Sequence, residues 1–445
     1  MSTFFARAST PLASLVKGST LGKGLTTGRT MALSLSTNVL LSVLLSVLLS
    51  GGWSMTANAC PPFLQGVTSS SLRLVDSKTG RLVNNGDVCA FSDRFQKARA
   101  SLRAQGVDPD TIADAKAPRL IDMERWDYHT RGFLDIFGSY DPNFVYPDPK
   151  GNWTVWQGWN SAAIYVDTIA QHNFQDLSHG TARIPNLDLK WLTYMHLRAL
   201  ATSEPGLAGK LRNGTELGVA FYRETAPKVS EIQAIDQSEY RSLLDPSKAI
   251  VSFRRSRCID ELTSTEQSRI KSSGRSKGTN LDLSAIDADA GNDFKDSKGV
   301  LRHCGYFKYA DQSEVQSQLA ALFQDISGRV DKFTIGRTYA WQTEHNVGPD
   351  AFASEDPILI AARAQRWFVS IHPFGGGNGR TSRFFMDYIS ESLGLPATTL
   401  ASMNQDITTS ERAWGQEIGI GMERVVRILE ICAQNIHADR CNHLE

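Results

Sequence analysis

A short stretch of this 445-residue chain combines residue types that can hold a phosphate group and remove a proton beside it. Imidazole is a common general base, glycine lets a ligand approach the backbone N–H groups, and arginine binds phosphate through paired N–H donors. We therefore predict a polyphosphate site with His372 as its candidate catalytic residue. The candidate site residues are His372, Gly375, Gly376, Gly377, Asn378, Gly379, Arg380 and Arg383.

Two predicted helices meet at this stretch. The first spans 356–371: Asp356 can cap it, and it must stop at His372 because Pro373 disfavours helical geometry in the residue before it. The second spans about 378–393, and its first N–H groups and positive dipole end form an anion site. The C-terminal dipole of the first helix is expected to favour the charged form of His372.

Two familiar phosphate loops are excluded here. A Walker loop has a lysine after its last glycine and a strand before it, whereas Arg380 follows Gly379 and a helix precedes this loop. A dinucleotide-binding loop also follows a strand. The structural alternative is a helix–turn–helix corner, with glycines for tightness and arginines in solvent.

The remaining pattern predicts a mainly α protein, since strand signals are sparse. Leu189, Leu192 and His196 share one face of a predicted helix over 187–201, where His196 is interpreted as a hydrogen-bonded packing residue. Further helices are predicted over 313–328 and in the C-terminal 45 residues.

Two other regions have distinctive compositions. A tryptophan patch at Trp153, Trp156 and Trp159 is expected to pack its region against the helices C-terminal to it, with ligand stacking as the alternative. Residues 260–300 are rich in Ser, Lys, Asp, Gly and Thr, which predicts a mobile insertion because little apolar surface can be buried.

The first 59 residues are typical of a secretory signal. They contain four basic and no acidic residues, then the apolar run VLLSVLLSVLL, then Ala57-Asn58-Ala59 before Cys60. The run is short for a membrane span. We expect cleavage after Ala59 and an exported protein, periplasmic or secreted; membrane attachment would require lipidation at Cys60 or an uncleaved leader, and a buried core helix is a further alternative.

Charge bears on the class of partner, and cysteine content bears on the compartment. Cleavage would leave 43 Lys and Arg against 47 Asp and Glu. The chain therefore lacks the excess of basic residues that is typical of a nucleic-acid-binding protein. An even number of cysteines in an exported chain favours disulfides, and proximity along the chain suggests that neighbours pair, with six buried thiols as the alternative. The cysteines and histidines do not have the clustered spacing of a zinc site, so no structural zinc site is predicted. The candidate pairs are Cys60–Cys89, Cys258–Cys304 and Cys432–Cys441.

The segment 372–383, HPFGGGNGRTSR, resembles the signature of the Fic (Fic/Doc, Fido-domain) family, H-P-F-x-(D/E)-G-N-G/K-R-x-x-R, at every specified position but one. The resemblance covers about 187–400. It includes a lead-in helix and the segment before a substrate-docking hairpin. The matching residues are Asp356, Pro357, Ile358, Ala361, Ala362, Phe368 and Ile371 in the helix, and Leu217, Gly218, Tyr222 and Arg223 before the hairpin.

The resemblance implies a Fic-type helical bundle with a small β-hairpin flap, an N-terminal extension and C-terminal helices. The implied domains are a signal peptide at 1–59, an extension at 60–185, a Fic-like domain at 186–400 with an insertion at 260–300, and a helical segment at 401–445.

By the same resemblance, His372 would deprotonate a Ser, Thr or Tyr hydroxyl of a target protein docked on the flap. That oxygen would attack a phosphate of ATP or of another nucleotide or phosphodiester donor, most often leaving AMP. Phe374 would anchor the loop, the glycines with Asn378 and Arg380 would cradle phosphate, and Arg383 would reach the outer phosphates. The sequence contains no S/T-x-x-x-E-G/N inhibitory helix of the kind many relatives carry.

Gly376 departs from the signature, because relatives place Asp or Glu there to hold Mg²⁺. Glycine offers no side-chain ligand, so no protein metal ligand is predicted and the role of Mg²⁺ stays open. Three explanations remain: a donor that needs no such metal, another carboxylate that reaches in, or a loss of turnover. Three functions are considered: an AMP transferase, a transferase with another phosphate-bearing donor, and a non-catalytic phosphate-binding or scaffolding protein.

Overall fold

The structure is a computed structural model, and residues 58–445 form one compact unit. It describes residues 60–75, 79–112, 153–179, 187–202, 204–212, 219–225, 241–255, 263–266, 301–342, 355–398 and 409–438, together with Ile184, Ser268, Phe294, Lys295, Asp406 and Cys441. The predicted leader therefore lies outside the described residues. No helix within the described ranges is long and apolar enough to cross a membrane.

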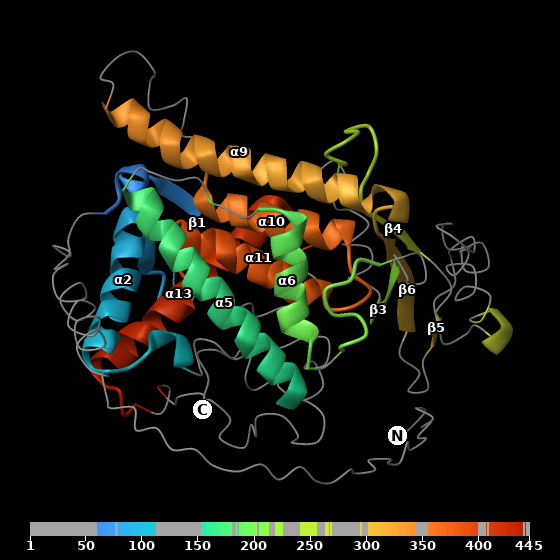
Figure 1. Cartoon of the computed structure of the whole chain (residues 1–445), viewed down its shortest axis with the longest axis horizontal. Coiled ribbons are helices and arrows are strands. Elements are labelled where there is room, and N and C mark those ends of the chain that lie inside the picture. Colours follow the sequence, from blue (N-terminus) through green and yellow to red (C-terminus); the bar gives the residue numbers. More distant parts are fainter. Residues whose placement is uncertain are drawn as a thin grey trace, which may run out of the picture. The chain divides into compact units, whose positions relative to one another are not determined.

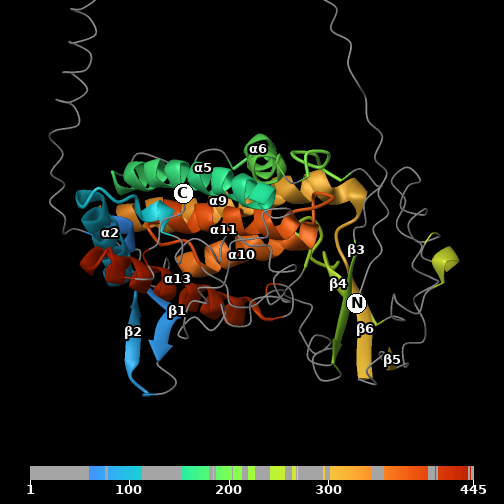
Figure 2. The same cartoon turned by 90° about the horizontal axis from the view of Figure 1, so that it is seen from below.

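Two buried helices, α10 (Pro357–Ile371) and α11 (Asn378–Ser392), form the centre of the unit. Figures 1 and 2 show them side by side, with α9 (Val315–Gln342) next to α10 and α5 (Trp153–Ser178) crossing α11. α6 (Leu189–Leu200) packs on α5 and α11, and α13 (Glu411–Gln434) packs on α10. The mainly helical prediction is confirmed.

The ends of α10 and α11 follow the predicted sequence signals. The Asp356 carboxylate accepts a hydrogen bond from Ile358 N at 2.9 Å, and Pro357 occupies the first turn. α10 ends at Ile371 before Pro373, and α11 ends shortly before Gly394, which has a positive φ of 80°. By contrast, α9 is longer than its predicted range of 313–328.

Aromatic side chains from several elements fill the space between these helices. Phe374, which lies between α10 and α11, is fully buried, and its ring centroid lies 6.2 Å from that of Phe368. Burial of one such side chain contributes about 1.5–3 kcal/mol. The loop is therefore attached directly to the core, as predicted for Phe374.

The N-terminal part contributes a hairpin and a helix. β1 (Thr68–Val75) pairs antiparallel with β2 (Leu82–Asp87), and α2 (Val88–Ala104) packs on α13. Three short 3-10 helices, Pro62–Leu64, Pro109–Thr111 and Gln312–Glu314, also lie among the described residues. The predicted extension thus packs within the same unit as the site.

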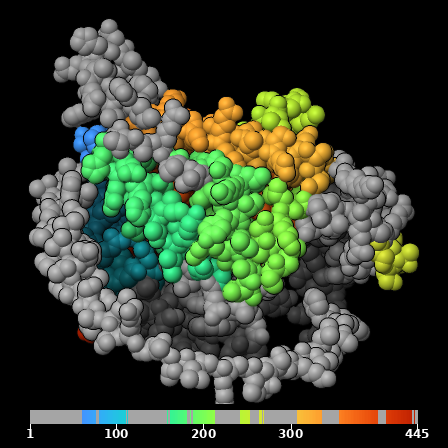
Figure 3. All heavy atoms as spheres, in the orientation of Figure 1, coloured from blue at the N-terminus to red at the C-terminus, as the bar shows by residue number. Residues whose placement is uncertain are grey.

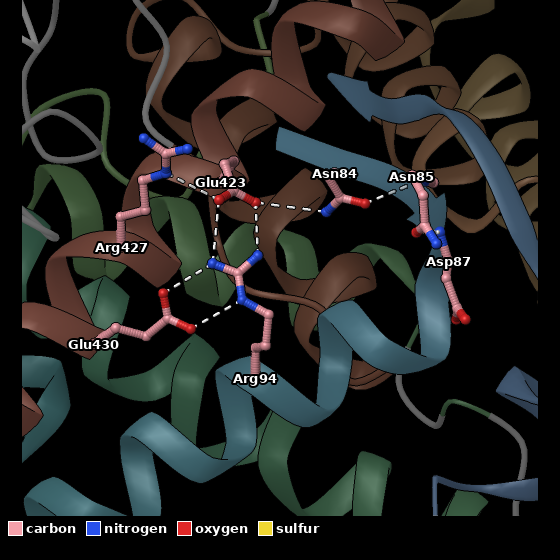
Figure 4. A network of polar contacts seen from close by, with 8 residues as sticks. Asn84, Asn85, Asp87, Arg94, Glu423, Arg427 and Glu430 are labelled. Carbon is pink, nitrogen blue, oxygen red and sulfur yellow. Dashed lines mark hydrogen bonds and ion pairs between the residues drawn. The ribbon is translucent and has the colours of Figure 1, made fainter. Parts of the chain in front are cut away.

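A charge network joins α2 to α13 (Figure 4). Arg94 donates to both carboxylate oxygens of Glu423 at 3.0 and 3.1 Å and to those of Glu430 at 2.8 and 2.9 Å. Arg427 also donates to Glu423, at 3.0 Å, and the Asn84 amide donates to it from β2 at 3.5 Å. Because the Glu423 side chain is only 6% exposed, its charge depends on these donors.

Two predicted disulfides are confirmed. Cys60 pairs with Cys89 and Cys432 pairs with Cys441, with Cα–Cα distances of 5.7 and 5.4 Å. Cys258 lies outside the described residues, so its pairing with Cys304 stays a prediction. Most of the insertion at 260–300 and the side chains of the tryptophan patch also lie outside them.

The second sheet is larger than the predicted two-stranded flap. β3 (Val219–Thr225) and β4 (Ser252–Arg255) flank β6 (Leu301–Lys308), all antiparallel, and β5 (Phe294–Lys295) pairs with the start of β6. β6 leads directly into Tyr309 and Ala310, both buried, and the Ala310 N–H donates to the Ser370 carbonyl at 3.3 Å. The sheet is therefore connected to the end of α10, where His372 lies.

Candidate active site

The loop between α10 and α11 is held closed by its own asparagine. The Asn378 side chain accepts from Phe374 N at 2.9 Å and donates to the Phe374 carbonyl at 2.7 Å. Both polar groups of its amide are therefore engaged by the loop backbone. Asn378 was predicted to cap the helix or to contact phosphate; its amide fixes the loop shape here, and the phosphate contact stays a prediction.

Gly377 occupies a position that suits only glycine. It precedes the first residue of α11, has φ 67°, and provides no side-chain cap for the helix. A Cβ on this residue would lie 2.6 Å from Leu200 Cδ1 at the end of α6. Glycine thus permits both the left-handed turn and the close contact with α6, and the first N–H groups of α11 remain without intrahelical partners.

His372 is partly buried and adopts a left-handed conformation with φ 51°. Its ring stacks on Tyr309 with centroids 4.0 Å apart. Burial lowers the pKa of His372 to about 3, the positive charge of Arg212 lowers it further, and the Val369 carbonyl opposes this shift. The expectation that the helix dipole supports a charged imidazole is therefore wrong here, because desolvation and Arg212 outweigh the dipole.

Arg380 pairs with a carboxylate that the sequence analysis did not identify. Its Nη2 donates to Glu204 Oε1 at 2.7 Å, and the Arg380 side chain is 3% exposed. The second oxygen, Oε2, lies 3.0 Å from the place where a Cβ on Gly376 would be, and Leu207 Cδ1 lies equally close to that place. The position that lacks the expected acidic side chain is thus adjacent to a carboxylate from another element.

His196 supports the same loop from α6. The Gly209 N–H donates to its Nδ1 at 2.9 Å, so its Nε2 carries the proton and donates to the Gly376 carbonyl at 3.0 Å. Burial lowers the pKa of His196 to about 4, and Arg380 lowers it further while the Gly376 carbonyl opposes this. Its ring stacks on Phe374 at 3.6 Å, in agreement with the predicted packing role.

The segment that follows α6, residues 201–212, contacts the loop along its length. Leu211 forms a β-bridge with Phe374, and Arg212 N donates to the Pro373 carbonyl at 2.8 Å. The Arg212 guanidinium donates to the Ala310 carbonyl and to that of Ile371 at 3.4 Å. Figure 3 shows α5, α6 and this segment in green on one face of the molecule, beside α9.

The remaining predicted residues lie in this loop and in α11. Gly375 and Gly379 are exposed, whereas Arg383 is buried in α11. No group of three or more His, Cys, Asp or Glu side chains able to hold a metal is found among the described residues. The carboxylate nearest to the Cβ position of residue 376 is that of Glu204.

The site thus combines an imidazole, a buried arginine at a helix start, and a glycine loop between them. This loop is contacted by Asn378, by α6 and by residues 201–212. In a comparison with protein families, the model of the Fic/DOC family matches residues 282–390. The chain thus contains a segment of the Fic/DOC family. Its Fic-family match ends after Ser390, within α11, and includes the whole of the loop and its signature.

Solved Fic structures match over most of this chain at low identity. Fic-1 from C. elegans, in a fragment with one substitution, is 15% identical with a TM-score of 0.34, covering 77% of this chain and 69% of that one. A Fic-domain signalling protein from Bacteroides thetaiotaomicron is 10% identical with a TM-score of 0.35, covering 77% and 97%. The unsubstituted C. elegans fragment is 13% identical with a TM-score of 0.32, covering 78% and 71%. Among curated proteins, no match is found.

Proposed function

We propose that this protein is a transferase that moves AMP, or a related phosphate-bearing group, from a nucleotide or phosphodiester donor onto a protein hydroxyl. The observation that carries the proposal is the position of the His372 imidazole, at one end of a loop that Asn378 holds closed and that leads into the anion-binding start of α11. The Fic signature in the same residues supports the same reaction class.

In the proposed step, the target hydroxyl oxygen attacks the α-phosphorus of the donor. His372 accepts the hydroxyl proton, the new O–P bond forms, and the bond from phosphorus to the leaving pyrophosphate breaks with its electron pair. The first N–H groups of α11 and Arg380 stabilise the charge on the phosphate oxygens. The Asn378 contacts with Phe374 keep these amides in place.

The low pKa of His372 has two consequences for this step. The ring is neutral at pH 7 and can accept a proton, yet it is a weak base in the absence of ligand. A bound polyphosphate would add negative charge close to Arg212 and the loop, and this charge favours the protonated ring. Donor binding is thus expected to raise the basicity of His372 when it is needed.

The second sheet is the proposed docking surface for the target. Within the described residues, no strand pairs with the outer edge of β3, so this edge can accept an extended peptide as an added strand. β3 pairs with β6, and β6 leads into Tyr309, which stacks on His372. A peptide on this edge would therefore be linked to His372 through two paired strands, β3 and then β6.

Export is part of the proposal. The two disulfides at Cys60–Cys89 and Cys432–Cys441 are compatible with an oxidising compartment. The acidic residues in excess over basic ones after residue 59 give no support for a nucleic-acid partner.

The test is transfer from labelled ATP and from other nucleotides and phosphodiesters, with and without Mg²⁺ or Mn²⁺, read by mass spectrometry of the protein and of a lysate. Adducts should form with the native chain and fall by about 10²–10⁴-fold in His372→Ala. His172→Ala is the matched control, because His172 is an exposed histidine on α5 and should leave transfer unchanged.

A non-catalytic phosphate-binding protein is the second candidate, and Gly376 is the observation that favours it. It would be supported if no donor yields an adduct while calorimetry detects ATP binding that Arg380→Ala abolishes. Loss of transfer in both His372→Ala and His172→Ala would contradict the role given to His372.

A further inference from the structure

The Glu204 carboxylate lies between a buried arginine and an empty side-chain position. Its Oε1 accepts from Arg380 Nη2 at 2.7 Å, while its Oε2 lies 3.0 Å from the Cβ position of residue 376. The Glu204 side chain is 29% exposed, so one edge of this otherwise buried pair reaches solvent. Oε2 can therefore contact a ligand that enters beside Gly376.

The backbone at Gly376 is already engaged. Its carbonyl accepts a hydrogen bond from His196 Nε2 at 3.0 Å, and Leu207 Cδ1 fills the other side of the position at 3.0 Å from the same Cβ point. An acidic side chain on residue 376 would start in contact with both Glu204 and Leu207. Glu204 thus occupies the space beside residue 376 that such a side chain would enter.

A polyphosphate at the start of α11 would meet this carboxylate. Arg380 attracts phosphate, but the negative charge of Glu204 is bound to the same guanidinium and repels it. A divalent cation removes this conflict, because Mg²⁺ is commonly held by one or two protein carboxylates together with substrate phosphates.

We propose that Glu204 supplies the protein carboxylate of a divalent-cation site that forms with a bound polyphosphate, in place of an acidic side chain on residue 376. Oε1 stays on Arg380, and Oε2 contacts the cation. The inference rests on the proposed function, since it assumes a polyphosphate at the start of α11.

The test is calorimetric titration of ADP into the full chain with and without Mg²⁺. In the native chain, Mg²⁺ is expected to raise ADP affinity about tenfold, which is an ordinary coupling between two ligands. Glu204→Gln should reduce this gain to less than about threefold. Asp93→Asn is the matched control, since it removes an exposed carboxylate from α2 and should keep the native gain.

An exchange of positions makes the test specific. Gly376→Asp alone should weaken ADP binding, because it crowds a second carboxylate against Glu204. Gly376→Asp combined with Glu204→Gly should recover the effect of Mg²⁺, since the carboxylate then comes from residue 376. Glu204→Asp keeps the charge and is the second variant to measure if Glu204→Gln does not fold. Circular dichroism monitors the folding of each variant.

Two results would overturn the inference: no effect of Mg²⁺ on ADP affinity in the native chain, or a full effect of Mg²⁺ in Glu204→Gln. If ADP affinity in Glu204→Gln rises equally with and without Mg²⁺, the effect of Mg²⁺ is full, and Glu204 only competes with phosphate for Arg380. Mg²⁺-dependent ADP binding through Glu204 without any protein adduct would uphold the inference and refute transfer. Protein adducts together with a full effect of Mg²⁺ in Glu204→Gln would do the opposite.

Discussion

The contact between Gly377 and α6 allows a quantitative test of how the loop is held. In Gly377→Ala, the left-handed backbone costs about 1–2 kcal/mol, and the clash of Cβ with Leu200 at 2.6 Å adds about 1–3 kcal/mol. The free energy of unfolding should therefore fall by about 2–5 kcal/mol. Urea titration followed by tryptophan fluorescence measures it.

Two controls separate the contributions. Gly106 has φ 78°, and a Cβ on this residue would have no atom within 4 Å, so Gly106→Ala should show only the backbone part, about 1–2 kcal/mol. Leu200→Ala removes the clashing side chain but costs about 2–5 kcal/mol of its own, because Leu200 is fully buried.

The double variant decides the question. Gly377→Ala with Leu200→Ala should cost about 1–3 kcal/mol less than the sum of the two single changes, because the clash is absent once Leu200 is shortened. If the two effects add within about 0.5 kcal/mol, the steric reasoning is refuted. A Gly377→Ala effect no larger than that of Gly106→Ala would refute it as well.

Two further predictions concern buried charges. His196 has a folded pKa of about 4, against an ordinary value near 6.5, so its contribution to stability is present above pH 6.5 and is lost as pH falls toward 4. In His196→Gln, the drop in unfolding free energy between about pH 7 and about pH 4.5 should therefore be about 2 kcal/mol smaller than in the native chain. Equal pH profiles for the two proteins would contradict this. Arg94→Met should lower stability by about 1–3 kcal/mol because Glu423 loses its main partner, whereas Asp93→Asn, which breaks an exposed pair with Lys97 on the same helix, should change it by about 0.5 kcal/mol or less. Similar urea midpoints for the two variants would show that the network in Figure 4 contributes nothing beyond a surface ion pair.

The parts of the site that could be predicted from the sequence are those determined by residues close to one another along the chain. Asp356, Pro357 and Pro373 fix the limits of α10 through capping and steric rules that act over a few residues. The glycines and Asn378 mark the loop in the same way. Prediction of the flap was less complete, because β4 pairs with β6 across the insertion and β5 lies within the insertion itself.

The parts that sequence could not predict depend on distant contacts. Glu204 and Arg380 are 176 residues apart, and only the fold brings them together. The one available signal was an acidic residue just after a predicted helix in the region resembling Fic proteins. The pKa of His372 was misjudged for the same reason, since Tyr309 and Arg212 approach it from other segments.

The dependence of the loop on residues 196–212 affects where the domain can be cut. A fragment limited to residues 282–390, the part matched by the family model, would keep the entire signature. It would lose the imidazole stacked on Phe374, the N–H that reaches the Pro373 carbonyl, and the carboxylate that neutralises Arg380. Such a minimal domain would keep the signature residues but lose the contacts that hold the loop in place. A recombinant fragment should therefore begin upstream of α6.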